Sequence, residues 1–152
     1  MELSNEQPDL TGLAFFEGIN DSSMTEIANC ARLMQCRTGT LVARQGEAAD
    51  EFYLIREGRL AVGFPAAQAE VTIQTLRAGD LVGWSWLMPP YQWQFDIRAV
   101  SDCVLIAIDG RTLRENCEVD RELGYELMKR LSHVMVERLR ATRLQLLDVY
   151  GE

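Results

Sequence analysis

Residues 76–83 have the sequence Leu76-Arg77-Ala78-Gly79-Asp80-Leu81-Val82-Gly83. The Gly-Asp pair predicts a turn, because glycine adopts positive φ angles without steric cost and aspartate bonds readily to nearby backbone. The apolar residues on either side of this turn favour short strands. The same arrangement recurs over a long stretch that is punctuated by Gly39, Gly46, Gly58, Gly63, Gly79, Gly83 and Gly110. Many short strands joined by turns predict an antiparallel sandwich or barrel-like roll.

The expected strands lie between these glycines, in runs rich in β-branched, aromatic and other apolar residues. They are residues 40–43, 52–55, 60–62, 71–73 and 97–108. Glu57-Gly58 predicts a tight hairpin turn between two of them. Residues 65–70 are expected to form an exposed hairpin loop.

Helices are predicted on both sides of the β-roll, which we place at residues 39–109. Residues 1–36 form the predicted N-terminal helical segment, with Asp21 or Ser22 as its N-cap. Its apolar face is expected to hold Met24, Ile27, Ala31 and Met34, which recur at helical spacing. Residues 110–151 are predicted to form the C-terminal helices, and the whole chain, residues 1–152, is expected to be a single domain.

The last helix is predicted to begin after the cap Asp120 and to end near Tyr150. At 1.5 Å per residue it would be on the order of 40 Å long, more than a domain of this size needs to cover its own core. We therefore expect its apolar stripe to contact the same helix of a second copy, in a homodimer. The candidate contact residues are Leu127, Leu131, Val134, Met135 and Arg138. The alternative is a helix that lies wholly on its own sheet.

The composition is that of a globular protein, with 47% hydrophobic and 25% charged residues among 152. No apolar run approaches the roughly 20 residues that cross a bilayer, and the acidic N-terminus is unlike a signal peptide. We therefore expect a cytoplasmic protein without membrane contact. The net charge of −8 opposes nucleic-acid binding, which needs clustered cations.

Cysteine and histidine usage argues against a metal centre, a cofactor and an enzyme. The four cysteines show no C-x-x-C spacing, so neither a metal nor a cofactor is expected. His133 is the only histidine, and no nucleophile stands beside it in the sequence. A general base of the usual kind is therefore hard to assemble, and the sequence favours a non-enzymatic protein.

All three tryptophans and two of the four prolines lie within residues 84–93. Aromatic side chains at this density either line a pocket or fill it, because they bury large apolar area. The two readings imply different functions, and composition alone does not separate them.

Four segments, in this order, resemble those of the cyclic-nucleotide-binding domain family in its catabolite-activator branch. They are a glycine-bounded opening at residues 46–58, the Gly-Asp segment at residues 76–83, a closing strand at residues 103–109 and the end of the last helix at residues 138–151. The resemblance runs from about Thr25 to Gly151. It implies an eight-stranded β-roll, flanking helices and dimerisation through the last helix. The activator branch continues into a helix-turn-helix domain where this chain ends, so we expect no direct role in transcription.

The chain departs from the family's pattern where the cyclic phosphate would bind. The family places a ribose-binding glutamate directly after the glycine that matches Gly83, and this position is Trp84. It places a phosphate-binding arginine further along, at the position of Trp93, and Arg98 matches a different position. Since a hydrogen bond to a charged group contributes about 1.5–3 kcal/mol, we expect ordinary cyclic AMP binding to be lost.

Two functions follow from the resemblance and its departures. The first is a regulatory sensor whose pocket takes a small molecule other than cyclic AMP. The second is a ligand-free dimerisation or docking module for a partner protein, in which Trp84 and Trp93 plug the pocket; a genuine cyclic AMP binder is the third and weakest. The candidate ligand-binding residues are Gly83, Trp84, Ser85, Trp86, Leu87, Trp93, Gln94, Phe95, Asp96 and Thr142.

Overall fold

The computed structural model describes residues 2–4 and 6–151; Met1, Asn5 and Glu152, which the predicted domain includes, lie outside them. The elements in chain order are β1 (Glu2–Leu3), the 3-10 helix η1 (Ala14–Phe16), α1 (Asp21–Asn29), β2 (Ala31–Cys36), β3 (Leu41–Ala43), β4 (Glu51–Glu57), β5 (Leu60–Phe64), β6 (Val71–Leu76), β7 (Leu81–Val82), β8 (Asp96–Ala99), β9 (Cys103–Asp109), α2 (Gly110–Val119) and α3 (Arg121–Tyr150).

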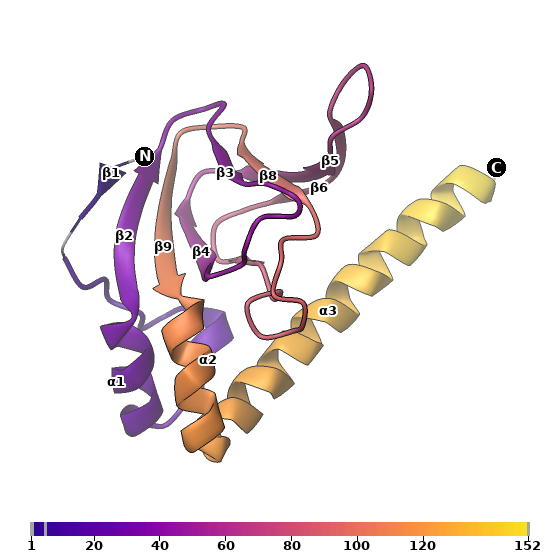
Figure 1. The fold of residues 1–152 in the computed structure, drawn as a ribbon. Helices are drawn as coiled ribbons and strands as arrows, with labels where there is room; N and C mark the ends of the chain where they lie inside the picture. Colours follow the sequence, from indigo (N-terminus) through magenta and orange to yellow (C-terminus); the bar gives the residue numbers. More distant parts are fainter. Residues whose placement is uncertain (1, 5, 152) are drawn as a thin grey trace.

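The strands form two antiparallel sheets, which together make up the β-roll. The helices α1 and α2 and the start of α3 lie at one end of this roll (Figure 1). One sheet has the order β1-β2-β9-β4-β7 and the other the order β3-β8-β5-β6. The predicted fold class, an antiparallel β-roll with flanking helices, is confirmed. The Gly58 turn has the expected positive φ of 94°, and residues 65–70 form the exposed loop between β5 and β6.

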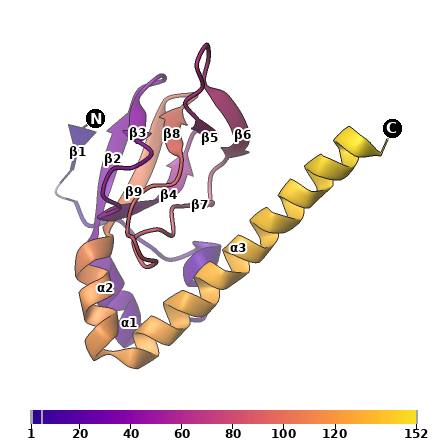
Figure 2. The same ribbon diagram turned by 45° about the vertical axis from the view of Figure 1, so that its right-hand side comes forward.

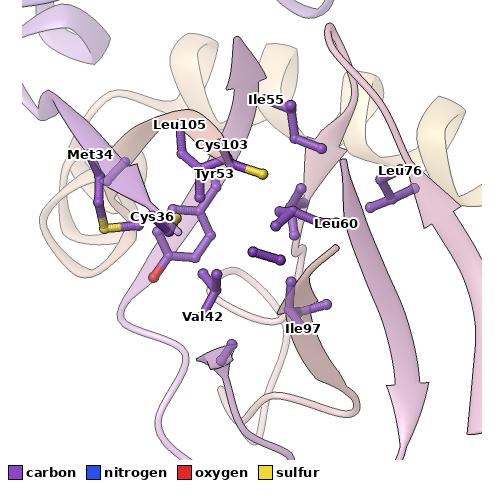
Figure 3. Close-up of a cluster of buried hydrophobic side chains, with 14 of the residues drawn as sticks. Met34, Cys36, Val42, Tyr53, Ile55, Leu60, Leu76, Ile97, Cys103 and Leu105 are labelled. Carbon is purple, nitrogen blue, oxygen red and sulfur yellow. The ribbon is translucent and has the colours of Figure 1, made fainter. Parts of the chain in front are cut away.

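The core has two parts because alternate residues of β4 point to opposite faces of its sheet. Tyr53 and Ile55 face the inside of the roll, where they join the cluster that Figure 3 shows. Phe52 and Leu54 face the other way, into a second cluster shared with η1, α1, α2 and α3. The helices are thus attached through one sheet, and α3 leaves from there past the mouth of the roll (Figures 1 and 2).

The predicted N-terminal helical segment, residues 1–36, is only partly correct: η1 and α1 are helical, and its other described residues are not. Residues 31–36 form β2, which pairs with β9 along its whole length. Ala31 and Met34 continue the helical spacing of α1, but the ladder to β9 satisfies their backbone groups instead, which no local pattern reveals. The N-cap of α1 is also one residue earlier than predicted: the Asn20 side chain accepts a hydrogen bond from the Ser23 backbone N–H at 2.8 Å.

Both C-terminal helices have an aspartate as N-cap, and the predicted cap Asp120 of the last helix is confirmed. Asp109 accepts a hydrogen bond from the Thr112 N–H at 3.0 Å, and Asp120 accepts one from the Leu123 N–H at 3.2 Å. α3 then runs for 30 residues, and all of residues 142–151 are exposed. Both ribbon views show this end of α3 standing away from the roll. No helix formed by the described residues is both long and apolar enough to cross a membrane.

The residues predicted for a dimer contact need a correction, because they face the chain's own domain. Leu127 and Leu131 are fully buried in the second cluster, and Val134 packs against it. Met135 and Arg138 line a cavity between α3 and the roll. The first half of α3 covers the core that α1 and the outer face of the sheet leave open, and its most apolar positions serve that purpose.

Candidate ligand-binding site

A cavity of about 240 Å³ lies between the β-roll and α3. We call it the roll cavity. Its walls come from β5, β6, β7, β8, the segment between β7 and β8, and α3; the lining residues are Val62, Ile73, Gln74, Leu76, Val82, Gly83, Trp84, Ser85, Trp93, Gln94, Phe95, Ile97, Met135, Arg138, Leu139 and Thr142. A mostly apolar enclosure with a few polar groups is the usual form of a small-molecule site.

Trp93 is the most buried aromatic of the cavity wall, with 7% of its surface exposed. Its backbone is tied to the loop before β4: its N–H donates to the Glu47 carbonyl at 2.9 Å, and its carbonyl accepts from the Gly46 N–H at 2.8 Å. Its ring stacks on Tyr53 with centroids 6.1 Å apart. A Cβ on Gly83 would lie 2.6 Å from the Trp93 ring, so the indole covers the Gly83 backbone.

Trp84 is half-buried and faces α3 rather than the core of the roll. The guanidinium carbon of Arg138 lies 5.3 Å from the centroid of the Trp84 ring, a cation–π distance. Arg138 also donates a hydrogen bond to the Leu81 carbonyl. One side chain of α3 therefore holds both the end of β7 and the first tryptophan after it.

Trp86 and Leu87, by contrast, lie away from the roll cavity. Trp86 is fully buried and stacks on Phe52 with centroids 4.5 Å apart and an interplanar angle of 10°. Its carbonyl accepts a hydrogen bond from Arg114 Nη1 at 2.6 Å, and Leu87 packs against the same cluster. Both residues anchor the segment to α2 and to the core.

Of the remaining candidate residues, some line the roll cavity and others lie outside it. Asp96 is buried and accepts a hydrogen bond from the Gln45 N–H at 2.9 Å, so it fixes a loop and does not reach the cavity. Phe95 lines the cavity and packs against Phe64, with ring centroids 5.1 Å apart and an interplanar angle of 60°. The Thr142 hydroxyl donates to the Arg138 carbonyl at 3.0 Å.

The structure thus brings seven predicted residues to one cavity and leaves three outside it. Those at the cavity are Gly83, Trp84, Ser85, Trp93, Gln94, Phe95 and Thr142. Sequence reasoning assigned Met135 and Arg138 to a dimer contact and did not place them here. Their spacing from Thr142, seven and four residues on one helix, was the signal that could have found them.

The roll cavity shares a wall with a larger groove of about 710 Å³ on the outside of β6 and β7. We call it the outer groove. Three basic side chains of α3, Lys129, Arg130 and His133, line this groove together with Asp80 and Glu137. Arg138 lines both spaces. Arg130 closes one end of the groove, where its Nη1 donates to the Phe15 carbonyl at 2.8 Å.

Cysteines and metal-binding side chains do not contribute to the site. Burial raises the pKa of the Cys117 thiol to about 11, and burial likewise raises the pKa of Cys30 and Cys36. Raised thiol pKa values mean protonated, unreactive cysteines near neutral pH. Within residues 2–4 and 6–151, no cluster of three or more His, Cys, Asp or Glu side chains could hold a metal ion.

Comparisons with known proteins agree with this architecture. A cGMP-dependent protein kinase of Drosophila melanogaster, isozyme 1, is 26% identical over 136 residues, which are 84% of this chain and 18% of the kinase. A solved structure of a Geobacter metallireducens protein named for cyclic-nucleotide binding superposes with a TM-score of 0.78 at 26% identity, over 84% of this chain and 92% of that one. The Thermus thermophilus catabolite activator protein superposes with a TM-score of 0.67 at 21% identity, over 90% and 62% of the two chains.

The chain therefore corresponds to a small part of the curated kinase and to nearly all of the Geobacter structure. The family model of the cyclic nucleotide-binding domain matches residues 33–120. This match spans the β-roll, the segment with all three tryptophans and α2. The two sheets, the cavity against a C-terminal helix and the matched segment lead to one conclusion: the chain belongs to the cyclic nucleotide-binding domain family.

Proposed function

We propose that the chain is a non-enzymatic regulatory domain whose roll cavity binds a small planar ligand other than cyclic AMP. One observation carries the proposal: an apolar cavity remains open beside α3, with indole rings at the two positions where the family's pattern has a glutamate and an arginine. Trp93 lies over Gly83, and Trp84 faces α3. A planar ligand can stack on such rings, whereas a ribose and a cyclic phosphate would lose charged partners.

The size of the loss supports a change of ligand. Removing the hydrogen bonds of one glutamate and one arginine weakens binding by about 4–6 kcal/mol, or a thousandfold or more. The Trp93 ring also occupies the space directly over Gly83. Both effects act against a cyclic nucleotide in its usual orientation, and neither acts against an aromatic ligand of similar breadth.

The non-enzymatic part of the proposal rests on the surroundings of His133. This histidine is exposed and lines the outer groove, not the roll cavity. The described lining of the roll cavity contains one serine, Ser85, and no histidine, cysteine or carboxylate that could activate it. A binding role needs none of these groups.

The intrinsic fluorescence of the tryptophans tests the proposed ligand class. Cyclic AMP and cyclic GMP at millimolar concentration are expected to leave the emission unchanged. The variant Trp86→Phe sharpens the test, because it keeps an aromatic ring on Phe52 and removes the emission of the core tryptophan, so that the signal comes from Trp84 and Trp93. A saturable quench by either nucleotide, with a micromolar midpoint, would contradict the proposal.

The proposed partner is a second copy of the chain, bound through the exposed side of α3. Large apolar side chains recur there at spacings of three, four, seven and eleven residues, which all return to one side of a helix. They are Tyr125, Val136, Leu139, Leu146 and Tyr150, each more than half exposed. We call this row the partner face; it lies on α3 about a third of a turn from the buried leucines, since each residue turns the helix by about 100°.

A second candidate function is a docking module without a ligand. The burial of Trp93 and its stacking on Tyr53 favour it, because the ring already fills part of the space inside the roll. Fluorescence and thermal-shift screening of a metabolite collection separates the two: a hit that stabilises the protein and changes Trp84 or Trp93 emission supports the ligand-binding function.

A further inference from the structure

Arg138 is the single charged side chain among the described residues that line the roll cavity. It is partly buried, and burial lowers the pKa of its guanidinium. It forms no ion pair with any residue that the structure describes; its contacts are the Leu81 carbonyl and the face of Trp84. The carboxylate of Asp80 acts on this guanidinium only through space, without an ion pair, and the effect of burial outweighs it. A partly buried guanidinium without a directly paired carboxylate favours an added anion.

The apolar part of the cavity lies directly beside this charge. Trp84, Trp93 and Phe95 supply aromatic rings, and Arg138 reaches them from α3. Within the described residues, the backbone N–H groups of Trp84 and Ser85, two lining residues, also have no backbone acceptor. Aromatic walls beside a cationic side chain match a ligand that has a flat apolar body and a negative end.

We infer that the ligand of the roll cavity is a planar aromatic acid whose anionic group pairs with Arg138. This inference rests on the proposed function and adds the charge and orientation of the ligand. The acid group then lies beside Arg138 of α3, whereas the family's pattern places its arginine at the position of Trp93, in the segment between β7 and β8. Arg138 exchanges the neutral Leu81 carbonyl for a charged acceptor, because a guanidinium binds a carboxylate or phosphate more strongly, with two parallel hydrogen bonds.

The outer groove is the competing location for an anion, since Arg138 also lines it. One feature favours the roll cavity: no tryptophan lines the groove to stack on an aromatic ligand. An anion that pairs with Arg138 from the groove would disturb Trp84, which Arg138 contacts, but would leave the indole signal of Trp93 unchanged. The Trp93 signal therefore distinguishes the two locations.

The test uses two probes of nearly the same shape, 2-naphthoate and its uncharged amide 2-naphthamide, with the full chain. Affinity is measured by calorimetry, and the three indole N–H signals are followed by NMR. The wild-type protein is expected to bind the carboxylate at least about tenfold more tightly than the amide, as one charge-assisted hydrogen bond requires. The Trp84 and Trp93 signals should shift, and that of Trp86 should shift least.

Three variants assign the preference to the residue. Arg138→Gln is expected to lose the preference and still bind the amide, whereas Arg138→Lys should retain part of it. Arg140→Gln is the matched control, because it removes the same charge from an exposed position of α3 whose side chain pairs with Glu137. The ratio between the probes is measured within each folded variant, so a loss of stability alone does not change it.

The possible results separate this inference from the proposed function. Equal binding of both probes, with shifts at Trp93 and no effect of Arg138→Gln, overturns the inference and leaves a neutral-ligand pocket. Binding without a shift at Trp93 places the acid in the outer groove and also overturns the inference. If neither probe binds, the cavity is closed to planar molecules, and both the proposed function and the inference fail.

Discussion

Gly83 and Trp93 are ten positions apart in the chain and depend on each other in the fold. Gly83 has a φ of 97°, a conformation that residues with a Cβ rarely adopt. Its missing side chain also makes room for the Trp93 ring, which would lie 2.6 Å from an added Cβ. Gly79 has nearly the same φ, 93°, but nothing lies within 4 Å of its Cβ position. The two glycines therefore separate backbone strain from steric overlap.

The substitution Gly79→Ala is expected to lower the free energy of unfolding by about 1–2 kcal/mol, from strain alone. Gly83→Ala should lower it by about 2–5 kcal/mol, because overpacking against Trp93 is added. In a Trp93→Leu background, which removes the overlapping ring, the effect of Gly83→Ala should fall to that of Gly79→Ala. Urea unfolding followed by circular dichroism measures all of these values. Equal losses for Gly83→Ala in the two backgrounds would contradict the close fit.

The composition of the tryptophan segment showed that it was special but did not reveal how its residues divide. Trp84, Trp86 and Trp93 have the same side chain, yet one faces α3, one stacks on Phe52 in the core and one covers Gly83. Which way each points depends on tertiary contacts, such as the Arg114 bond to the Trp86 carbonyl. The position of the candidate site along the chain was predictable, and the direction in which each indole points was not.

Among the elements, α3 changes its role along its length. Leu123, Leu127 and Leu131 are buried in the chain's own core, and all of residues 142–151 are exposed. The helix and its N-cap were predictable from Asp120 and the apolar spacing. The side that faces the domain was not, because two apolar sides a third of a turn apart look alike in sequence. β2 was mistaken for helix because its pairing with β9 is a long-range contact, which the local spacing of apolar residues does not show.

The partner face of α3 is tested by one charged substitution. Leu146→Glu is expected to convert a dimer into a monomer, because it buries a carboxylate in the proposed contact, at a cost of several kcal/mol. The thermal midpoint of the folded domain should change little, since Leu146 is 53% exposed. Light scattering at micromolar protein measures the mass.

Leu144→Glu is the matched control for this experiment. Leu144 is 57% exposed and lies on α3 about 200° from Leu146, away from both apolar sides. The substitution Leu144→Glu should therefore leave the dimer intact. A wild-type protein that is monomeric at micromolar concentration, or a dimer that survives Leu146→Glu, would contradict the proposed contact.

At the scale of the whole molecule, the roll cavity lies at the interface between two parts of the chain, the β-roll and α3. The β-roll supplies most of its lining residues, and α3 supplies Met135, Arg138, Leu139 and Thr142. The link between α3 and β6 on this side includes the Gln145 side chain, which lies at hydrogen-bond distance from the Ile73 carbonyl. A ligand in the cavity therefore touches the roll and the helix at once, and its affinity depends on how they sit together.

Leu139 belongs both to the lining of the roll cavity and to the partner face, with 53% of its surface exposed. Saturating 2-naphthoate is therefore expected to change the dissociation constant of the dimer, by about 5-fold or more for a typical coupling between sites. Sedimentation with and without the probe measures the change. The control Leu139→Ala should reduce the effect of the probe on the dimer. Identical dimer dissociation constants of the wild-type protein with and without the probe would contradict the coupling.

Coupling between two equilibria is reciprocal: if a ligand tightens the dimer, the dimer tightens the ligand by the same factor. Because one leucine of α3 takes part in both contacts, the amount of the protein itself then helps to decide how much ligand it holds. At a low concentration the protein would be mostly monomeric and would respond at one ligand concentration. At a high concentration it would be mostly dimeric and would respond at another. The domain would report the product of two quantities, the level of a metabolite and its own abundance.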